Sequence, residues 1–143
     1  MNDGSFPLLR RIEKRFPGAS KFVGKRLLIC GSRDFFDRLP ISLTIYCFEP
    51  SALINGCALG ADTIANEEFR KIGKEPEEYP ADWDRYHRAA GPIRNAQMLA
   101  EGKPDIVIAF YSDYKRSRGT KDMVDKARDA GVFVVELGLT EEE

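Results

Sequence analysis

The chain has 143 residues, a length that suits one globular domain. It carries 22 Lys and Arg against 23 Asp and Glu, so it has no overall positive charge that would attract nucleic acid. No apolar run reaches the roughly 18 residues of a membrane helix, and the first residues lack the apolar core of a secretory signal, so we expect neither. Three widely spaced cysteines and a single histidine, His87, predict a reduced, cytoplasmic protein without a metal site.

Residues 1–24 predict an amphipathic N-terminal extension. Apolar residues at helical spacing alternate there with basic ones: Leu8, Leu9, Ile12 and Phe16 with Arg10, Arg11, Lys14 and Arg15. Pro17-Gly18 ends the pattern. We expect this helix to pack on the domain or on a second copy of the chain. Binding to a membrane surface or to nucleic acid is the alternative, which Glu13 weakens by diluting the positive charge.

Short apolar runs that stop at turn residues predict buried parallel strands at 26–30, 53–56, 105–110 and 132–136, with a weaker candidate at 77–79. Helical patterns at 61–72, 92–100 and 123–130 lie between them, each followed by glycine. The β-branched residues of 39–48 favour a strand weakly, but neighbouring parallel strands need a crossover, so we predict a helix. The result is an α/β fold over 25–137, a single doubly wound, mostly parallel sheet of about five strands with helices on both faces. Residues 138–143 form an acidic tail.

In such a sheet, ligands bind beyond the carboxyl ends of the strands. Gly31, Ser32, Arg33 and Asp34 follow the first strand, where they form either an anion-binding turn or a plain turn with a surface arginine. Gly56 and Gly60 in the next such loop suggest close approach of a ligand to the backbone. Asp62 either caps the following helix or accepts a hydrogen bond from a ribose hydroxyl.

Asp82, Trp83, Arg94 and Asn95 form the third segment. We expect Arg94 in the first turn of its helix, where a cation is disfavoured, so that Asp82 or a bound anion has to compensate. Trp83 either stacks on a base or belongs to the core. His87 is either an acid or base or, as we favour, a surface residue.

Ser117, Arg118, Gly119 and Thr120 form the fourth segment, at the start of the last helix. Free N–H groups, a glycine and a hydroxyl there predict a phosphate site, with a simple threonine cap as the alternative. Each segment alone favours the simpler explanation, but four segments at one edge of the sheet predict a binding site.

These motifs occur in an order that resembles the YspA/YpsA-related branch of the SLOG superfamily over roughly residues 25–137. The matching stretches are Gly31-Ser32-Arg33-Asp34-Phe35, Gly56-x3-Gly60-Ala61-Asp62, Pro80-Ala81-Asp82-Trp83, Ala90-Gly91-Pro92-Ile93-Arg94-Asn95-x2-Met98 and Arg118-Gly119-Thr120-x2-Met123. The resemblance implies a Rossmann-like fold that binds a nucleotide or a nucleotide derivative, such as an NAD- or ADP-ribose-like molecule. Its relatives include the LOG phosphoribohydrolases and DNA-processing protein A. The ligand contacts that it implies are Gly31, Ser32, Arg33, Gly60, Asp62, Arg94, Asn95, Gly119 and Thr120.

The chain departs from the family pattern in its loops. Arg116-Ser117 replaces a pair of glycines, and the loop at 111–115 is longer than usual. Cys57 and His87 also stand where glycine is common. A side chain in a glycine position leaves less room for a phosphate to approach the backbone, which indicates a different or bulkier ligand, or none. The basic run of Lys115, Arg116 and Arg118 could offset the lost backbone contacts with charge-assisted hydrogen bonds.

Three functions follow, in order of preference. The first is non-catalytic binding or sensing of a small nucleotide ligand, with self-association into a homo-oligomer as a further expectation. The second is hydrolysis of an N-glycosidic bond. Met123 occupies the position of the family's catalytic glutamate, and the neighbouring Asp122 projects about 100° away from that position on a helix, which argues against this reaction. Asp62 or Asp82 could supply the carboxylate instead. The third is single-stranded nucleic-acid binding by Tyr111, Tyr114, Lys115, Arg116 and Arg118, which ranks last because the net charge is near zero.

Overall fold

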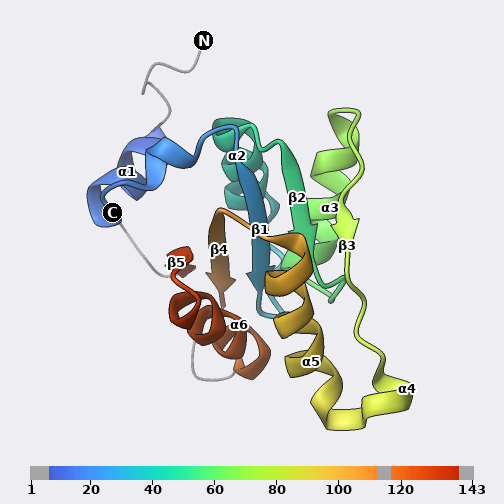
Figure 1. The fold of residues 1–143 in the computed structure, drawn as a ribbon. Coiled ribbons are helices and arrows are strands. Elements are labelled where there is room, and N and C mark those ends of the chain that lie inside the picture. Colours follow the sequence, from blue (N-terminus) through green and yellow to red (C-terminus); the bar gives the residue numbers. More distant parts are fainter. Residues whose placement is uncertain (1–6, 113–116, 139–143) are drawn as a thin grey trace.

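The computed structural model describes residues 7–112 and 117–138, which form a five-stranded sheet in the order β3-β2-β1-β4-β5 (Figure 1). The strands are β1 (Arg26–Gly31), β2 (Ala52–Asn55), β3 (Glu77–Glu78), β4 (Ile106–Tyr111) and β5 (Phe133–Gly138). Every neighbouring pair runs parallel, and Leu28 of the central strand β1 pairs with Ile54 on one side and Val107 on the other. The predicted doubly wound α/β fold is confirmed, with all its strands parallel.

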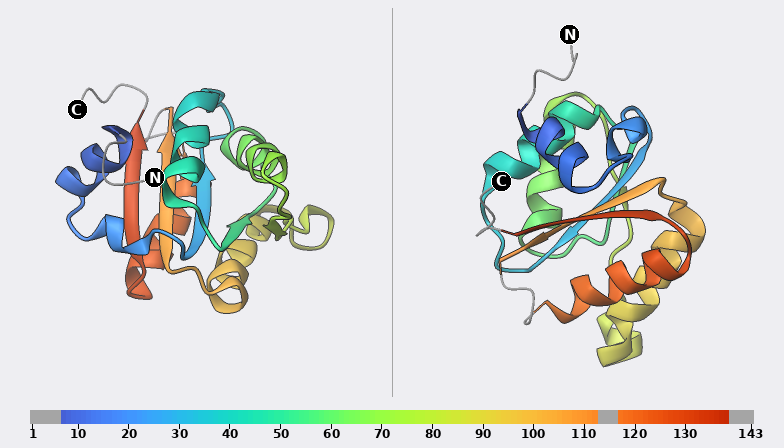
Figure 2. Two further views of the ribbon diagram at one scale, coloured as in Figure 1. Left: turned by 90° about the horizontal axis from the view of Figure 1, so that it is seen from above. Right: turned by 90° about the vertical axis from the view of Figure 1, so that its left-hand side faces the viewer.

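Helices cover both faces of the sheet (Figure 2). One face carries α1 (Pro7–Arg15), α2 (Arg38–Phe48) and α3 (Ala61–Lys71), and the other carries α5 (Ala90–Gln97), its π-helical continuation η3 (Met98–Gly102) and α6 (Arg118–Asp129). Since successive side chains of a strand point to opposite faces, Leu27 and Ile29 join the first core, whereas Leu28 and Cys30 join the second. The segment 39–48, ambiguous from its sequence, is the helix that the crossover argument predicted.

The amphipathic N-terminal helix packs on the domain. Leu9 and Ile12 of α1 are buried in the same core as α2, while Arg10 and Arg11 are exposed. The Glu13 carboxylate accepts hydrogen bonds from the N–H groups of Gly18 and Ser20 at 2.8 and 2.9 Å, and these bonds lower its pKa. A short 3-10 turn, η1 (Ala19–Phe22), then leads into β1. Within the ranges described, no helix is long and apolar enough to cross a membrane.

The segment between β3 and α5 differs from its prediction. It forms two short turns, α4 (Trp83–Tyr86) and η2 (His87–Ala89), and α5 begins at Ala90 instead of at Pro92. Pro92 fits as the third residue of α5 because N–H groups in the first turn have no acceptor within the helix. Arg94 therefore lies beyond the first turn, and the expectation that the helix end disfavours its charge is wrong.

Candidate functional site

A crevice of about 690 Å³ opens beyond the carboxyl ends of β1 and β4, where the strand order of the sheet reverses. Ten of the thirteen predicted site residues line it: Gly31, Ser32, Arg33, Asp62, Trp83, Arg94, Asn95, Arg118, Gly119 and Thr120. Gly56 lines an adjoining hollow of about 370 Å³, whereas Gly60 and Asp82 line neither. The four segments therefore meet at one place, as predicted, because parallel strands end at the same edge.

The two glycines of the β2–α3 loop make room for protein. A Cβ at Gly56 would lie 2.2 Å from Nη1 of Arg94, and a Cβ at Gly60 would lie 2.5 Å from the Ser32 carbonyl oxygen. We expected a ligand to approach the backbone at these two glycines. Neighbouring segments of the protein fill that space instead. Gly119 differs, because a Cβ there would meet nothing within 4 Å. At Gly119, in the first turn of α6, the space beside the backbone is therefore open.

Asp62 holds the β2–α3 loop. Its Oδ2 accepts hydrogen bonds from the N–H groups of Gly56 and Ala58, at 3.0 and 3.1 Å, while Gly60 is the N-cap of α3. Burial raises the pKa of Asp62 to about 6. The Ala58 N–H, the charge of Arg94 and the Gly56 N–H act in the opposite direction and lower this pKa, but burial has the larger effect. The capping role considered for Asp62 is therefore wrong, and the carboxylate forms part of the crevice wall.

Arg94 lines the crevice and bonds to the loop that follows β2. Its Nη1 donates to the carbonyl oxygens of Gly56 and Tyr79, at 2.5 and 3.4 Å, and its Nε donates to Oδ1 of Asn95 at 3.0 Å. Burial lowers the pKa of Arg94, and the Asp62 carboxylate counteracts this. The expected partner, Asp82, instead accepts the N–H of Arg85 at 3.2 Å and caps α4.

Asn95 joins α5 to α6. Its side chain is buried, and Nδ2 donates to the Gly119 carbonyl oxygen at 3.1 Å and to Oδ2 of Asp122 at 3.0 Å. Asp122, which the helical period placed away from the site, lines the crevice together with Met123 and pairs with Lys126 at 2.5 Å. The angular argument fails because α6 presents its N-terminal end to the crevice, so residues on adjacent sides of the helix reach it.

Serine hydroxyls connect the first segment to the fourth. Oγ of Ser32 forms a short hydrogen bond with Oγ of Ser117 and accepts the N–H of Ser112 at 3.2 Å. Ser117 is the N-cap of α6, and Thr120 lies within the first turn, so the threonine cap considered as an alternative is wrong. Sequence reasoning named Asp34 in the first segment and Ser117 in the fourth without assigning either a contact, and it missed Cys30 and Arg88 as crevice residues. Arg88 carried a signal that could have found it, because it is a cation in the Pro-Ala-Asp-Trp to Arg-Asn stretch.

Trp83 is an exposed aromatic residue at the rim. Its side chain is 46% exposed, and the Arg33 guanidinium lies 5.5 Å from the centre of its ring. The prediction that Trp83 belongs to the core is therefore wrong. Its stacking on a base stays a prediction. His87 is exposed, as we favoured, and lines neither hollow.

The nucleic-acid patch loses one aromatic residue. Tyr111 is buried in β4 and cannot stack on a base there, while Tyr114, Lys115 and Arg116 lie outside the described residues, as do 139–143 of the acidic tail. Among the described residues that line the crevice, four arginines face three aspartates: Arg33, Arg88, Arg94 and Arg118 against Asp34, Asp62 and Asp122. This balance suits an anion.

No protein-family model matches the chain, and no solved structure matches it significantly. Its sequence is similar to that of the Gene 61 protein of Mycobacterium phage D29. The two are 33% identical over 124 residues, which cover 80% of this chain and 97% of the phage protein. The shared region thus takes in nearly the whole of that relative.

Proposed function

The chain belongs to the same family as the Gene 61 protein of Mycobacterium phage D29, and from its crevice we propose that it binds a nucleotide or nucleotide-derived ligand without turning it over. One observation carries the proposal. An open helix N-terminus at Gly119 and an exposed indole at Trp83 lie in the same crevice, at the point where the strand order reverses. The phosphate and the flat base of a nucleotide would each have a suitable surface there.

The phosphate surface is the first turn of α6. The leading N–H groups of a helix have no acceptor within it and carry partial positive charge, so they bind anions. Arg118 and Gly119 are exposed in this turn, and Arg33 is exposed on the facing loop. A phosphate here would receive charge-assisted hydrogen bonds from both arginines as well as backbone N–H groups.

A thermal-shift screen tests this proposal, with AMP, ADP, NAD, ADP-ribose and cyclic nucleotides as probes. A ligand at 100 times its dissociation constant stabilises a fold by about 2.7 kcal/mol, which corresponds to a shift of a few degrees in Tm. We expect Arg33→Ala and Arg118→Ala to lose the shift, and Arg11→Ala, which removes an exposed cation from α1, to keep it. The proposal fails if none of the probes shifts the wild type, or if Arg33→Ala and Arg118→Ala shift as much as Arg11→Ala.

A second candidate is hydrolysis of the N-glycosidic bond of a nucleotide, favoured by the carboxylate of Asp122 in the crevice. A carboxylate beside the bond to be cleaved could stabilise the positive charge that develops on the sugar. Chromatographic detection of the free base, after incubation with each compound that binds, tests it. If the wild type releases the free base and Asp122→Asn does not, the protein is a hydrolase. If a compound binds and no base is released, the non-catalytic function stands.

A further inference from the structure

One segment at the rim of the site is anchored far less than the rest. Residues 82–86, which comprise Asp82 and α4, project from the body of the protein (Figure 1). All five side chains are exposed, and the chain next reaches the core at Ala90. Trp83 of this segment lines both the crevice and the adjoining hollow. A segment that buries no apolar side chain costs little free energy to displace, and moving parts of ligand sites are typically of this kind.

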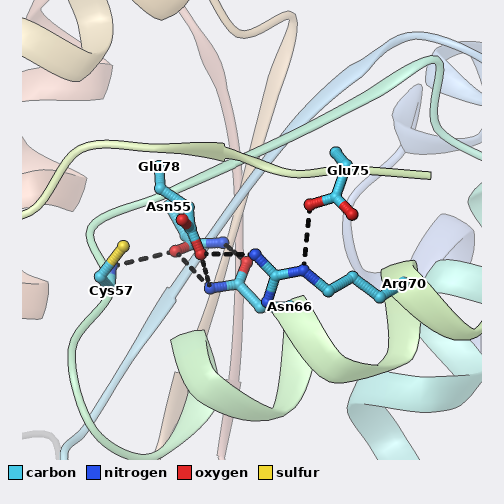
Figure 3. Close-up of polar contacts among 6 residues, drawn as sticks. All are labelled: Asn55, Cys57, Asn66, Arg70, Glu75 and Glu78. Carbon is cyan, nitrogen blue, oxygen red and sulfur yellow. Dashed lines mark hydrogen bonds and ion pairs between the residues drawn. The ribbon is translucent and has the colours of Figure 1, made fainter.

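The β2–α3 loop lines the same hollow, but polar contacts hold it in place. The Asn55 side chain accepts the N–H of Cys57 at 3.0 Å, and the Asn55 and Asn66 amides bond to each other (Figure 3). Asn66 also donates to Glu78 at 3.1 Å, which ties the pair to β3. In the part of the chain that the structure describes, no salt bridge or side-chain hydrogen bond joins residues 82–86 to the rest of the protein. The site therefore has one fixed wall and one loosely held wall.

The backbone is strained where the loosely held wall ends. His87 has φ 52° and ψ −126°, a conformation that glycine adopts readily and that residues with a side chain rarely adopt. Its N–H donates to the carbonyl oxygen of Trp83 and closes α4. Strain of this kind is concentrated at ligand clamps and switch segments. Since residues 82–86 have no buried side chain that would enforce the strain, a movement about His87 can relieve it.

We propose, resting on the proposed function, that residues 82–86 form a lid that closes on the bound ligand through a change of backbone angles at His87. Hinges of this kind use a few residues at the ends of elements. Trp83 is 46% exposed and Tyr86 37% exposed, so the lid carries two aromatic rings that a ligand could cover. A ligand that contacts these rings better in the closed state shifts the lid toward that state.

Calorimetric titration of His87→Gly with AMP, ADP, NAD and ADP-ribose tests the lid. Glycine removes the strain of the open conformation, so closure no longer gains from its relief. The variant should unfold at a higher temperature than the wild type and bind each probe that the wild type binds about fivefold more weakly, or weaker still. His87→Ala keeps the Cβ and removes the imidazole, so its affinity should equal that of the wild type.

The matched control is Glu49→Gly. Glu49 also has a positive φ, 44°, but it ends α2 and lines neither the crevice nor the adjoining hollow. Glycine there should raise the unfolding temperature and leave affinity unchanged, which separates a gain in stability from an effect on the lid.

The fluorescence of Trp83 gives a second measurement, because it is the single tryptophan of the chain. We expect a probe that binds to move its emission to shorter wavelength and to protect it from quenching by acrylamide. If a probe binds and both signals stay unchanged, or if His87→Gly binds as tightly as His87→Ala, the lid is overturned while the binding site stands. If no probe binds to the wild type, the lid and the proposed function are both overturned.

Discussion

The guanidinium of Arg94 occupies the position that a side chain at Gly56 would need. Its Nη1 donates to the Gly56 carbonyl oxygen at 2.5 Å, and a Cβ on Gly56 would come within 2.2 Å of that nitrogen. This contact joins α5 to the loop after β2, and both hollows of the site border it. The arrangement of the crevice therefore depends on a residue without a side chain.

We expect Gly56→Ala to destabilise the protein by about 1–3 kcal/mol, because an added methyl group in a filled space forces its neighbours to move. Urea unfolding measures this loss. In an Arg94→Ala background the same substitution should cost much less, since the clashing guanidinium is gone. Equal costs in the two backgrounds would show that the contact between residues 56 and 94 does not limit the space.

Gly119→Ala should separate binding from stability. A Cβ at this position meets nothing within 4 Å, and alanine favours a helix over glycine, so we expect the free energy of unfolding to stay equal or rise by roughly 0.5–1 kcal/mol. Affinity for any nucleotide that the wild type binds should fall, because the methyl group stands before the N–H groups that face a phosphate. Calorimetry measures this affinity, and a value equal to that of the wild type would place the phosphate elsewhere.

The stability of the protein should fall as pH rises through the titration of Asp62. Burial raises the pKa of Asp62 from 3.8 to about 6, so the folded state holds a proton that the unfolded state has lost. Below pH 3.8 both states are protonated and the group contributes nothing; above pH 6 the folded state carries the full cost of a buried charge, about 3 kcal/mol.

Asp62→Asn checks this linkage, because asparagine keeps an acceptor oxygen for the N–H groups of Gly56 and Ala58. We expect the variant to match the wild type near pH 4 and to exceed it in stability near pH 7.5, as measured by urea unfolding at both pH values. A variant that is less stable than the wild type at pH 7.5 would mean that the charge of Asp62 is favourable in place.

Cys57 holds a backbone conformation that suits glycine. Its φ is 61°, in the left-handed region, and its side chain is exposed. We expect Cys57→Gly to stabilise the fold by about 1 kcal/mol, because the Cβ strain of that conformation disappears and little packing is lost. Cys57→Ala retains the Cβ and serves as the control, with no such gain. Thermal unfolding that ranks the alanine variant equal to the glycine variant would argue against strain at this position.

Local sequence patterns were enough to predict the sheet and the edge that carries the site. Leu27 to Cys30 form an apolar run that stops at Gly31, and 106–111 form another, so buried parallel strands followed directly from composition and length. Because the carboxyl ends of parallel strands lie at one edge, Ser32 and Thr120 were predicted to face the same crevice without any knowledge of distances. These inferences succeed because they need only periodicity and connectivity.

What each of these residues contacts depends on how segments far apart in the chain pack together. The space beside Gly56 belongs to Arg94, 38 residues away, because of the way α5 docks on the sheet. Asp122 reaches the crevice because α6 begins there, and Trp83 stays exposed because α4 buries none of its residues. A helical period gives the angle of a side chain around its own axis, whereas the position of that axis depends on packing between segments far apart in the chain.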